Sequence, residues 1–265
     1  MKILKLKPKQ DIKTNHNYHV NYGAWDEIEG DEFILEGFNS NIEAYDVVFL
    51  PMYKRWVDMG LLNKIKNSKV KTVLFDNDSC YRTFNNPFYR DIDLILYRCP
   101  DENGNTPNTN SIWHPWSVDT SLYSPIYGGE GVTLSCSVSN DYPLRQKITK
   151  IIKNTSVSGK EYIKLLQKSG GVIHTDSNLV PMVRAKALEI ASCGSQIISN
   201  RTNKMDYFFP DELVTYFDSV VELEEIIKNF KPNMEIQKEL RHIVETRHDN
   251  KIRANEIIEQ IKEIL

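Results

Sequence analysis

The stretch GVIHTDSNLVPMVRAKALEIASCGSQIISN, residues 171–200, decides the fold. Its apolar start, Gly171 to His174, predicts a short strand, and a polar loop follows. Val183 to Cys193 has the apolar spacing of a helix. Gly194 follows at the position where a residue in the left-handed conformation commonly ends a helix. A second apolar strand is expected at Gln196 to Ser199. Strand, helix and strand in this order predict a parallel α/β unit.

The alternation continues toward the N-terminus. Apolar runs of strand length recur in the first hundred residues, and three of them are continuous: Val47 to Leu50, Val73 to Phe75 and Leu94 to Tyr97. Runs without strict alternation are expected of parallel strands that are buried on both faces. A helix is expected at Val57 to Asn67, so this part of the chain also follows a βαβ order.

Residues 111–125, SIWHPWSVDTSLYSP, mix aromatic and turn residues and are expected to join two units. Beyond them we expect strands at Val132 to Val138 and Leu213 to Phe217, and helices at Leu144 to Asn154, Lys160 to Ser169, Val221 to Phe230 and Met234 to the end. The predicted fold class is therefore α/β with two successive units, residues 1–118 and 119–265. The last helix is expected to cross back to the first unit.

Composition excludes several classes of protein. The 265 residues carry 33 Lys and Arg against 36 Asp and Glu, a formal charge of −3. The chain therefore lacks the excess of basic residues that is typical of proteins that bind the nucleic-acid backbone. No apolar stretch approaches the ~20 residues of a membrane span, and the N-terminus lacks the apolar run of a secretory signal. The four cysteines form no C-x-x-C pair and are expected to be free thiols. These features predict a cytoplasmic protein without a structural metal.

The polar loop after Gly171 to His174 is the best candidate for a binding site. Ligands of open α/β sheets bind at the carboxyl ends of the strands, where a helix N-terminus supplies free N–H groups and positive potential. An anion such as a diphosphate is therefore expected at this loop, and a guanidinium one turn into the helix can grip it through two N–H groups. The candidates are His174, Thr175, Ser177, Asn178, Arg184, Lys186 and Glu189.

Five segments resemble the CgeB-like group of GT-B glycosyltransferases. The helix from Arg184 through Glu189 to Cys193 and Gly194 resembles its R, E and C-G pattern before an apolar strand, and Asp211 to Phe217 resembles its D-E-L segment. The interdomain pattern V-D-x-x-x-(F/Y)-x-P is matched by Val118, Asp119, Tyr123 and Pro125. Arg145 matches the arginine-bearing helix start, and His248 and Arg253 match the closing H-x-x-x-x-R. The resemblance covers roughly residues 110 to 260.

This resemblance implies two facing Rossmann-like domains, the first abbreviated, and transfer of a sugar from a nucleotide-sugar donor to the hydroxyl of an unidentified acceptor. The second domain would bind the donor, with Glu189 near the ribose or sugar hydroxyls and Arg145 and Arg184 near the diphosphate. No metal or other cofactor would be needed, since arginines and helix N–H groups stabilise the leaving diphosphate. The acceptor could be a polymer, a small molecule, a protein or modified DNA.

Other interpretations remain open from the residues alone. Lys186 and Glu189 are three apart on a helix, so a surface ion pair would also explain them. Asp76-Asn77-Asp78 ends a strand, where Asp78 could accept the acceptor proton, cap a turn, or hold a metal as in a GT-A enzyme. A nucleotide-sugar-binding module without transfer, and a phage-type enzyme that modifies DNA, are further alternatives.

Overall fold

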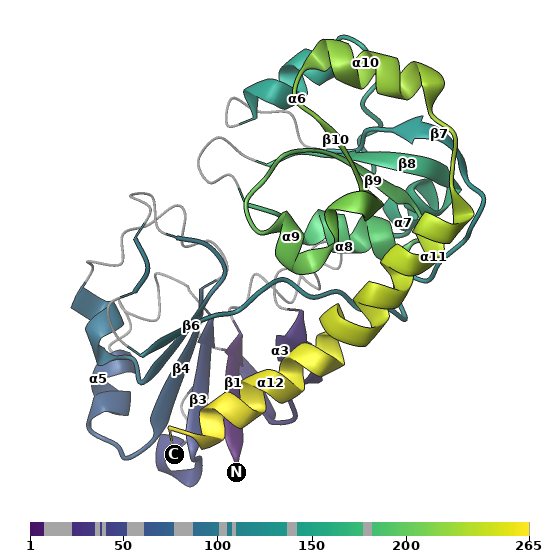
Figure 1. The fold of residues 1–265 in the computed structure, drawn as a ribbon. Coiled ribbons are helices and arrows are strands. Elements are labelled where there is room, and N and C mark those ends of the chain that lie inside the picture. The colour runs from purple at the N-terminus through teal and green to yellow at the C-terminus, as the bar shows by residue number, and fades with distance from the viewer. Residues whose placement is uncertain are drawn as a thin grey trace. The chain divides into compact units, whose positions relative to one another are not determined.

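The computed structural model describes residues 1–7, 23–34, 38, 41–51, 61–76, 87–100, 105–107, 110–136, 142–176 and 182–264. Two compact units divide the chain: unit 1 contains Met1–Pro115 together with Arg253–Leu265, and unit 2 contains Trp116–Ile252. Each is an α/β unit built on one parallel sheet (Figure 1). Within the described residues, no helix has the length and apolar character that crossing a membrane requires.

Unit 1 is built on a six-stranded parallel sheet in the order β2-β1-β3-β4-β5-β6. The strands are β1 (Ile3–Lys7), β2 (Asp31–Ile34), β3 (Val47–Pro51), β4 (Lys71–Asp76), β5 (Leu94–Tyr97) and β6 (Ser111–Trp113). The helices α3 (Ala24–Glu27), α5 (Leu61–Lys66) and α12 (Asn250–Lys262) accompany them, with α12 entering the unit from the far end of the chain.

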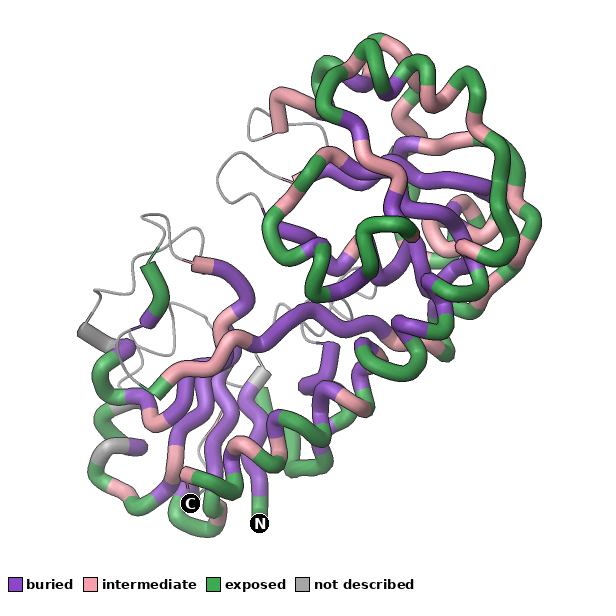
Figure 2. Tube along the Cα trace, in the orientation of Figure 1, coloured by how far each residue is buried: buried purple, intermediate pink, exposed green. Residues whose placement is uncertain are grey.

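Both faces of this sheet are covered, as the continuous apolar runs predict. Alternate residues of β3, β4 and β5 belong to two separate apolar clusters, because successive strand side chains point to opposite faces. One cluster includes Ile65 of α5, and the other includes Trp25 of α3 and Ala254, Ile257 and Ile261 of α12. Figure 2 shows the central strands β3, β4 and β5 buried along most of their length, whereas β2 is exposed.

Unit 2 has a four-stranded parallel sheet in the order β10-β9-β8-β7. Its strands are β7 (Glu130–Thr133), β8 (Ser169–His174), β9 (Gln196–Asn200) and β10 (Val214–Phe217). Its helices are α6 (Pro143–Ile148), α7 (Gly159–Lys168), α8 (Ala185–Ser192), α9 (Met205–Phe208), α10 (Val220–Asn229) and α11 (Met234–Ile243). Gly194 ends α8 with φ of 80°, the left-handed conformation that the sequence predicts there.

The structure corrects four expected elements. Ser111–Trp113, expected within the junction, is an edge strand that pairs in parallel with β5. The strand expected at Val132 to Val138 starts earlier, at Glu130, and ends at Thr133. The helix expected at Leu144 to Asn154 ends at Ile148. The helix expected from Met234 to the end is interrupted after a π-helical turn at Val244–His248. The interruption has a local cause: the Asp249 carboxylate accepts the backbone N–H of Lys251 and so caps a new helix, α12.

Candidate functional site

Polar groups from two adjacent strands meet at the carboxyl edge of the unit 2 sheet. Asp176 follows β8, and its carboxylate accepts a hydrogen bond of 3.0 Å from the amide of Asn200, the last residue of β9. Burial raises the pKa of Asp176, and its hydrogen bonds and the nearby Arg184 oppose this rise. The edge is therefore lined by groups that are already ordered before any ligand binds.

Arg145 is fixed at this edge by the residue that follows β8. Its Nε donates to Thr175 Oγ1 at 2.6 Å, and one terminal nitrogen donates to the Thr175 carbonyl at 3.0 Å. The guanidinium also stacks on the Tyr142 ring, 3.6 Å from its centroid. Pro143 starts α6, where its missing N–H costs no helical hydrogen bond. Burial lowers the pKa of Arg145, which nevertheless stays charged at neutral pH because it starts from 12.5.

His174 is a neutral side chain at the end of β8. Its Nδ1 lies 3.0 Å from Ser199 Oγ, whose hydroxyl donates to the Asn200 carbonyl, and its Nε2 accepts the N–H of Arg184 at 3.5 Å. These contacts place the ring proton on Nδ1. Burial and the positive charges of Lys186, Arg145 and Arg184 lower the pKa of His174 to about 3. His174 therefore orients the start of α8; that it also contacts a ligand stays a prediction.

Arg184 and Lys186 bring two further cations to the same place. Arg184 is the N-cap residue of α8, with extended backbone, and its side chain does not cap the first N–H groups of the helix. The Lys186 ammonium lies over the Tyr162 ring, 5.8 Å from its centroid. Burial lowers the pKa of Lys186 to about 8, so the ammonium is mostly protonated at pH 7.

Glu189 is buried, which rules out the solvent-exposed surface ion pair. Its side chain belongs to a residue only 5% exposed, and its Oε2 accepts the Tyr162 hydroxyl at 2.8 Å. Burial raises the pKa of Glu189, while the hydrogen bond from Tyr162 and the charge of Lys186 act in the opposite direction. The carboxylate therefore lies near the cations, and among the described residues no direct ion pair neutralises its charge.

Together these side chains form a cationic cluster, which we name the β8 edge: Arg145, His174, Thr175, Asp176, Arg184, Lys186 and Glu189. Three cations act on the neutral His174, and two carboxylates lie among them. The arrangement can bind an anion through guanidinium and backbone N–H groups and can accept hydrogen bonds from hydroxyls.

The sequence predicted most of the β8 edge but not the tyrosines and the asparagine that support it. Tyr142, Tyr162 and Asn200 carry no motif, and Tyr162 reaches Glu189 from α7, 27 residues earlier in the chain. Ser177 and Asn178, predicted in the same loop, and Asp78, predicted as a base, lie outside the described residues. Among the residues that are described, no group of three or more His, Cys, Asp or Glu side chains could hold a metal.

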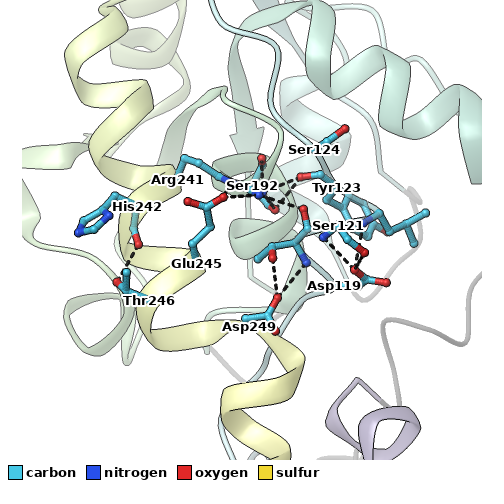
Figure 3. A network of polar contacts seen from close by, with 12 residues as sticks. Asp119, Ser121, Tyr123, Ser124, Ser192, Arg241, His242, Glu245, Thr246 and Asp249 are labelled. Carbon is cyan, nitrogen blue, oxygen red and sulfur yellow. Dashed lines mark hydrogen bonds and ion pairs between the residues drawn. The ribbon is translucent and has the colours of Figure 1, made fainter.

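A second polar network fixes the segment through which the chain enters unit 2 (Figure 3). The Arg241 guanidinium of α11 donates to the carbonyls of Thr120, Tyr123 and Ser192, at 3.0, 2.8 and 2.9 Å, and pairs with Glu245 at 2.6 Å. Asp249 accepts the Thr120 hydroxyl at 2.6 Å. These bonds satisfy buried carbonyl groups, so this network supports the site without lining it.

The fold and the β8 edge define an α/β protein whose second unit gathers three cations at the carboxyl edge of its sheet. The family model described as Glycosyl transferase-like matches residues 122–259, just over half of the chain, and the chain belongs to this family. The glycosyltransferase class expected from the sequence is thereby confirmed. A search of curated proteins found no match.

Solved structures confirm the predicted fold class, which is an α/β fold of the GT-B type with two parallel sheets. A glycosyltransferase from Rickettsia africae has a TM-score of 0.67 at 12% identity, covering 99% of this chain and 98% of that one. HepE from Anabaena, in complex with UDP and glucose, has a TM-score of 0.65 at 12% identity, covering 99% and 100%. The β-glucosyltransferase of phage T4 has a TM-score of 0.61 at 9% identity, covering 100% and 99%.

Proposed function

We propose that the chain transfers a hexosyl group from a nucleoside-diphosphate sugar to an acceptor hydroxyl, and that unit 2 binds the donor. One observation carries the proposal: Arg145, Arg184 and Lys186 converge on the carboxyl end of β8, at the start of α8, inside the region that the family model matches. UDP, bound in the HepE structure, has the diphosphate and ribose that cations and a carboxylate recognise.

For this transfer, the protein mainly has to position the reactants and supply positive charge. The acceptor oxygen bonds to the anomeric carbon, the bond from that carbon to the diphosphate oxygen breaks, and the diphosphate takes up the electron pair. Arg145, Arg184 and Lys186 stabilise that developing negative charge, together with the N–H groups that begin α8. Because these groups supply positive charge themselves, we propose a reaction that needs neither a metal nor another cofactor.

The finer assignments are part of the same proposal. The Arg184 to Gly194 and Asp211 to Phe217 segments support placement in the CgeB-like group. Unit 1 would bind the acceptor, and Asp78 would accept the proton of its hydroxyl. Cys99, Cys136 and Cys193 are free thiols, which fits a reducing compartment such as the cytoplasm.

A panel of nucleoside diphosphates and their sugars, scored by thermal shift, tests donor binding. We expect one base to raise the melting temperature clearly above the others, since a ligand that binds only the folded protein stabilises it in proportion to its affinity. Arg145→Gln should lose the shift. A panel in which no nucleotide stabilises the wild-type protein would contradict the proposal.

Labelled donor then separates transfer from binding alone. A glycosyltransferase should hydrolyse the stabilising sugar nucleotide slowly without acceptor, and EDTA should leave the rate unchanged. Tight binding with no turnover would favour a nucleotide-sugar-binding module. Manganese-dependent turnover lost in Asp78→Ala would favour the GT-A arrangement.

A further inference from the structure

The hydroxyl groups of two tyrosines face the buried Glu189 carboxylate. Tyr162 donates to Glu189 Oε2 at 2.8 Å from the first turn of α7, and the Tyr123 hydroxyl faces the same carboxylate from the segment before β7. A cation in direct contact would neutralise the carboxylate, whereas a phenol orients it and leaves its charge in place.

Both phenols are fixed as donors. Burial and the neighbouring Glu189 carboxylate raise the pKa of Tyr162 well above 10 and raise the pKa of Tyr123 as well, so both hydroxyls keep their protons at neutral pH. A protonated phenol that faces a carboxylate donates to it. The two donors therefore favour the ionised form of Glu189 against the effect of its burial.

Tyr123 is itself held in place by the network of Figure 3. Its carbonyl accepts hydrogen bonds of 2.8 Å from the Ser192 hydroxyl and 2.8 Å from the Arg241 guanidinium. Ser192 follows Glu189 by less than one turn on α8, so the same contacts fix the helix and the tyrosine relative to each other. The Glu189 carboxylate is consequently confined from both α7 and the entry segment.

We infer that Tyr162, assisted by Tyr123, is a positioning residue that holds Glu189 as an ionised, oriented acceptor for the vicinal hydroxyls of the donor ribose. This inference rests on the proposed function. Two vicinal hydroxyls donate to one carboxylate only when it is charged and correctly rotated, and Tyr162 provides both conditions without touching the ligand.

The test is a double-mutant cycle read by calorimetry with UDP and 2′-deoxy-UDP, or with the base that gives the largest thermal shift. Wild type, Tyr162→Phe, Glu189→Gln and the double variant are compared. Tyr162→Phe should weaken UDP binding about tenfold and 2′-deoxy-UDP binding much less, because the lost orientation matters most for two hydroxyls. In the Glu189→Gln background, Tyr162→Phe should have almost no further effect.

The pH profile supplies a readout that a purely structural role would not change. Among the described residues, the titratable groups that face Glu189 are Tyr162, Tyr123, Lys186 and Cys193. Removing the Tyr162 donor raises the pKa of Glu189, so the fall of UDP affinity on acidification should begin at a higher pH in Tyr162→Phe than in wild type. Glu189→Gln records the titration of UDP itself and is subtracted.

Controls make each outcome decisive. Tyr45→Phe removes a matched phenol-to-carboxylate bond, 2.9 Å to Asp31 in unit 1, and should leave UDP affinity unchanged. Tyr123→Phe should repeat the Tyr162→Phe result at smaller size and replaces it if Tyr162→Phe fails to fold. A Tyr162→Phe variant that matches wild type, or one equally harmful in the Glu189→Gln background, overturns this inference alone. A wild type that binds no nucleoside diphosphate overturns the proposed function too.

Discussion

Two lysines, one in each unit, differ in how their ammonium groups are paired. Lys5 of β1 is buried, and its ammonium pairs with Glu32 at 2.7 Å and donates to the carbonyls of Ile28 and Trp25 at 2.7 and 3.2 Å. Lys186 of α8 faces the Tyr162 ring, and within the described residues no carboxylate comes within ion-pair distance of it. Lys5 has a complete set of partners inside the fold, whereas Lys186 has no ion-pair partner among the described residues.

The difference separates a structural cation from a binding cation. A buried charge is costly unless it is paired, so a fold that keeps an incompletely paired ammonium gains little stability from it. Lys186 lies beside Arg145 and Arg184, which increases the cost further. The proposed function assigns the positive charge of unit 2 to a ligand, whereas the charge of Lys5 in unit 1 is paired within the fold.

The largest effect is expected at Arg145, the best-ordered cation of the β8 edge. Arg145→Ala should weaken donor binding about 100- to 1000-fold, since hydrogen bonds between charged groups contribute about 1.5 to 3 kcal/mol each. Arg145→Lys should recover only part of this loss, because an ammonium lacks the planar fork. Calorimetry with the nucleotide sugar measures both, with Arg90→Ala, an exposed arginine of unit 1, as control. Equal losses at the two arginines would remove the distinction between the units.

Lys5→Met tests the other side of the comparison. It should lower the free energy of unfolding by about 2 to 3 kcal/mol, because two buried carbonyls lose their donor, and leave donor affinity unchanged. Lys186→Met should do the reverse, with stability unchanged or higher and weaker donor binding. Denaturant unfolding and calorimetry on the two variants decide this. Loss of donor affinity in Lys5→Met would show that unit 1 also contributes to the donor site.

Glu189→Ala should weaken donor binding about tenfold without unfolding the protein. It removes an acceptor for ribose hydroxyls and also the cost of burying a carboxylate, which offsets the Tyr162 hydrogen bond that is lost. Circular dichroism checks the fold and calorimetry the affinity. Unchanged affinity would remove Glu189 from the β8 edge.

The smallest expected effect is a pH dependence. Because the pKa of Lys186 is about 8, the ammonium is present below pH 8 and lost above it, and donor affinity should fall about three- to fivefold as pH rises through that value. Calorimetry at neutral and alkaline pH measures this. Lys186→Met should bind weakly at both and show no step. A step that persists in this variant would assign the titration to another group.

The fold was predictable where one physical rule determined each element. Continuous apolar runs predict doubly buried strands, and β3, β4 and β5 are such strands, while Gly194 predicts the end of α8. Ser111–Trp113 was interpreted as junction because three residues carry too little pattern, and it becomes a strand only because β5 offers it a pairing edge. The break at Asp249 depends on its capping bonds, which local hydrophobic spacing does not reveal.

From spacing alone, the site was predictable only for residues close in sequence, and Arg145 was expected there through the family resemblance. His174, Thr175, Arg184 and Glu189 lie along one strand, loop and helix, so their common location follows from the topology of a parallel sheet. The contacts that give them their states come from elsewhere: Thr175 orients Arg145, and Tyr162 orients Glu189. These pairings depend on how α6 and α7 pack on the sheet, and no spacing in a single sequence encodes it.

The helix α12 has a consequence for how the protein is made. It begins in unit 2 and continues into unit 1, where Ala254, Ile257 and Ile261 complete the apolar cluster around Trp25 and Phe75. During translation the whole of unit 2 leaves the ribosome before these side chains do. The N-terminal sheet is synthesised first, but the apolar cluster on one of its faces can be completed only after residue 261 has been made.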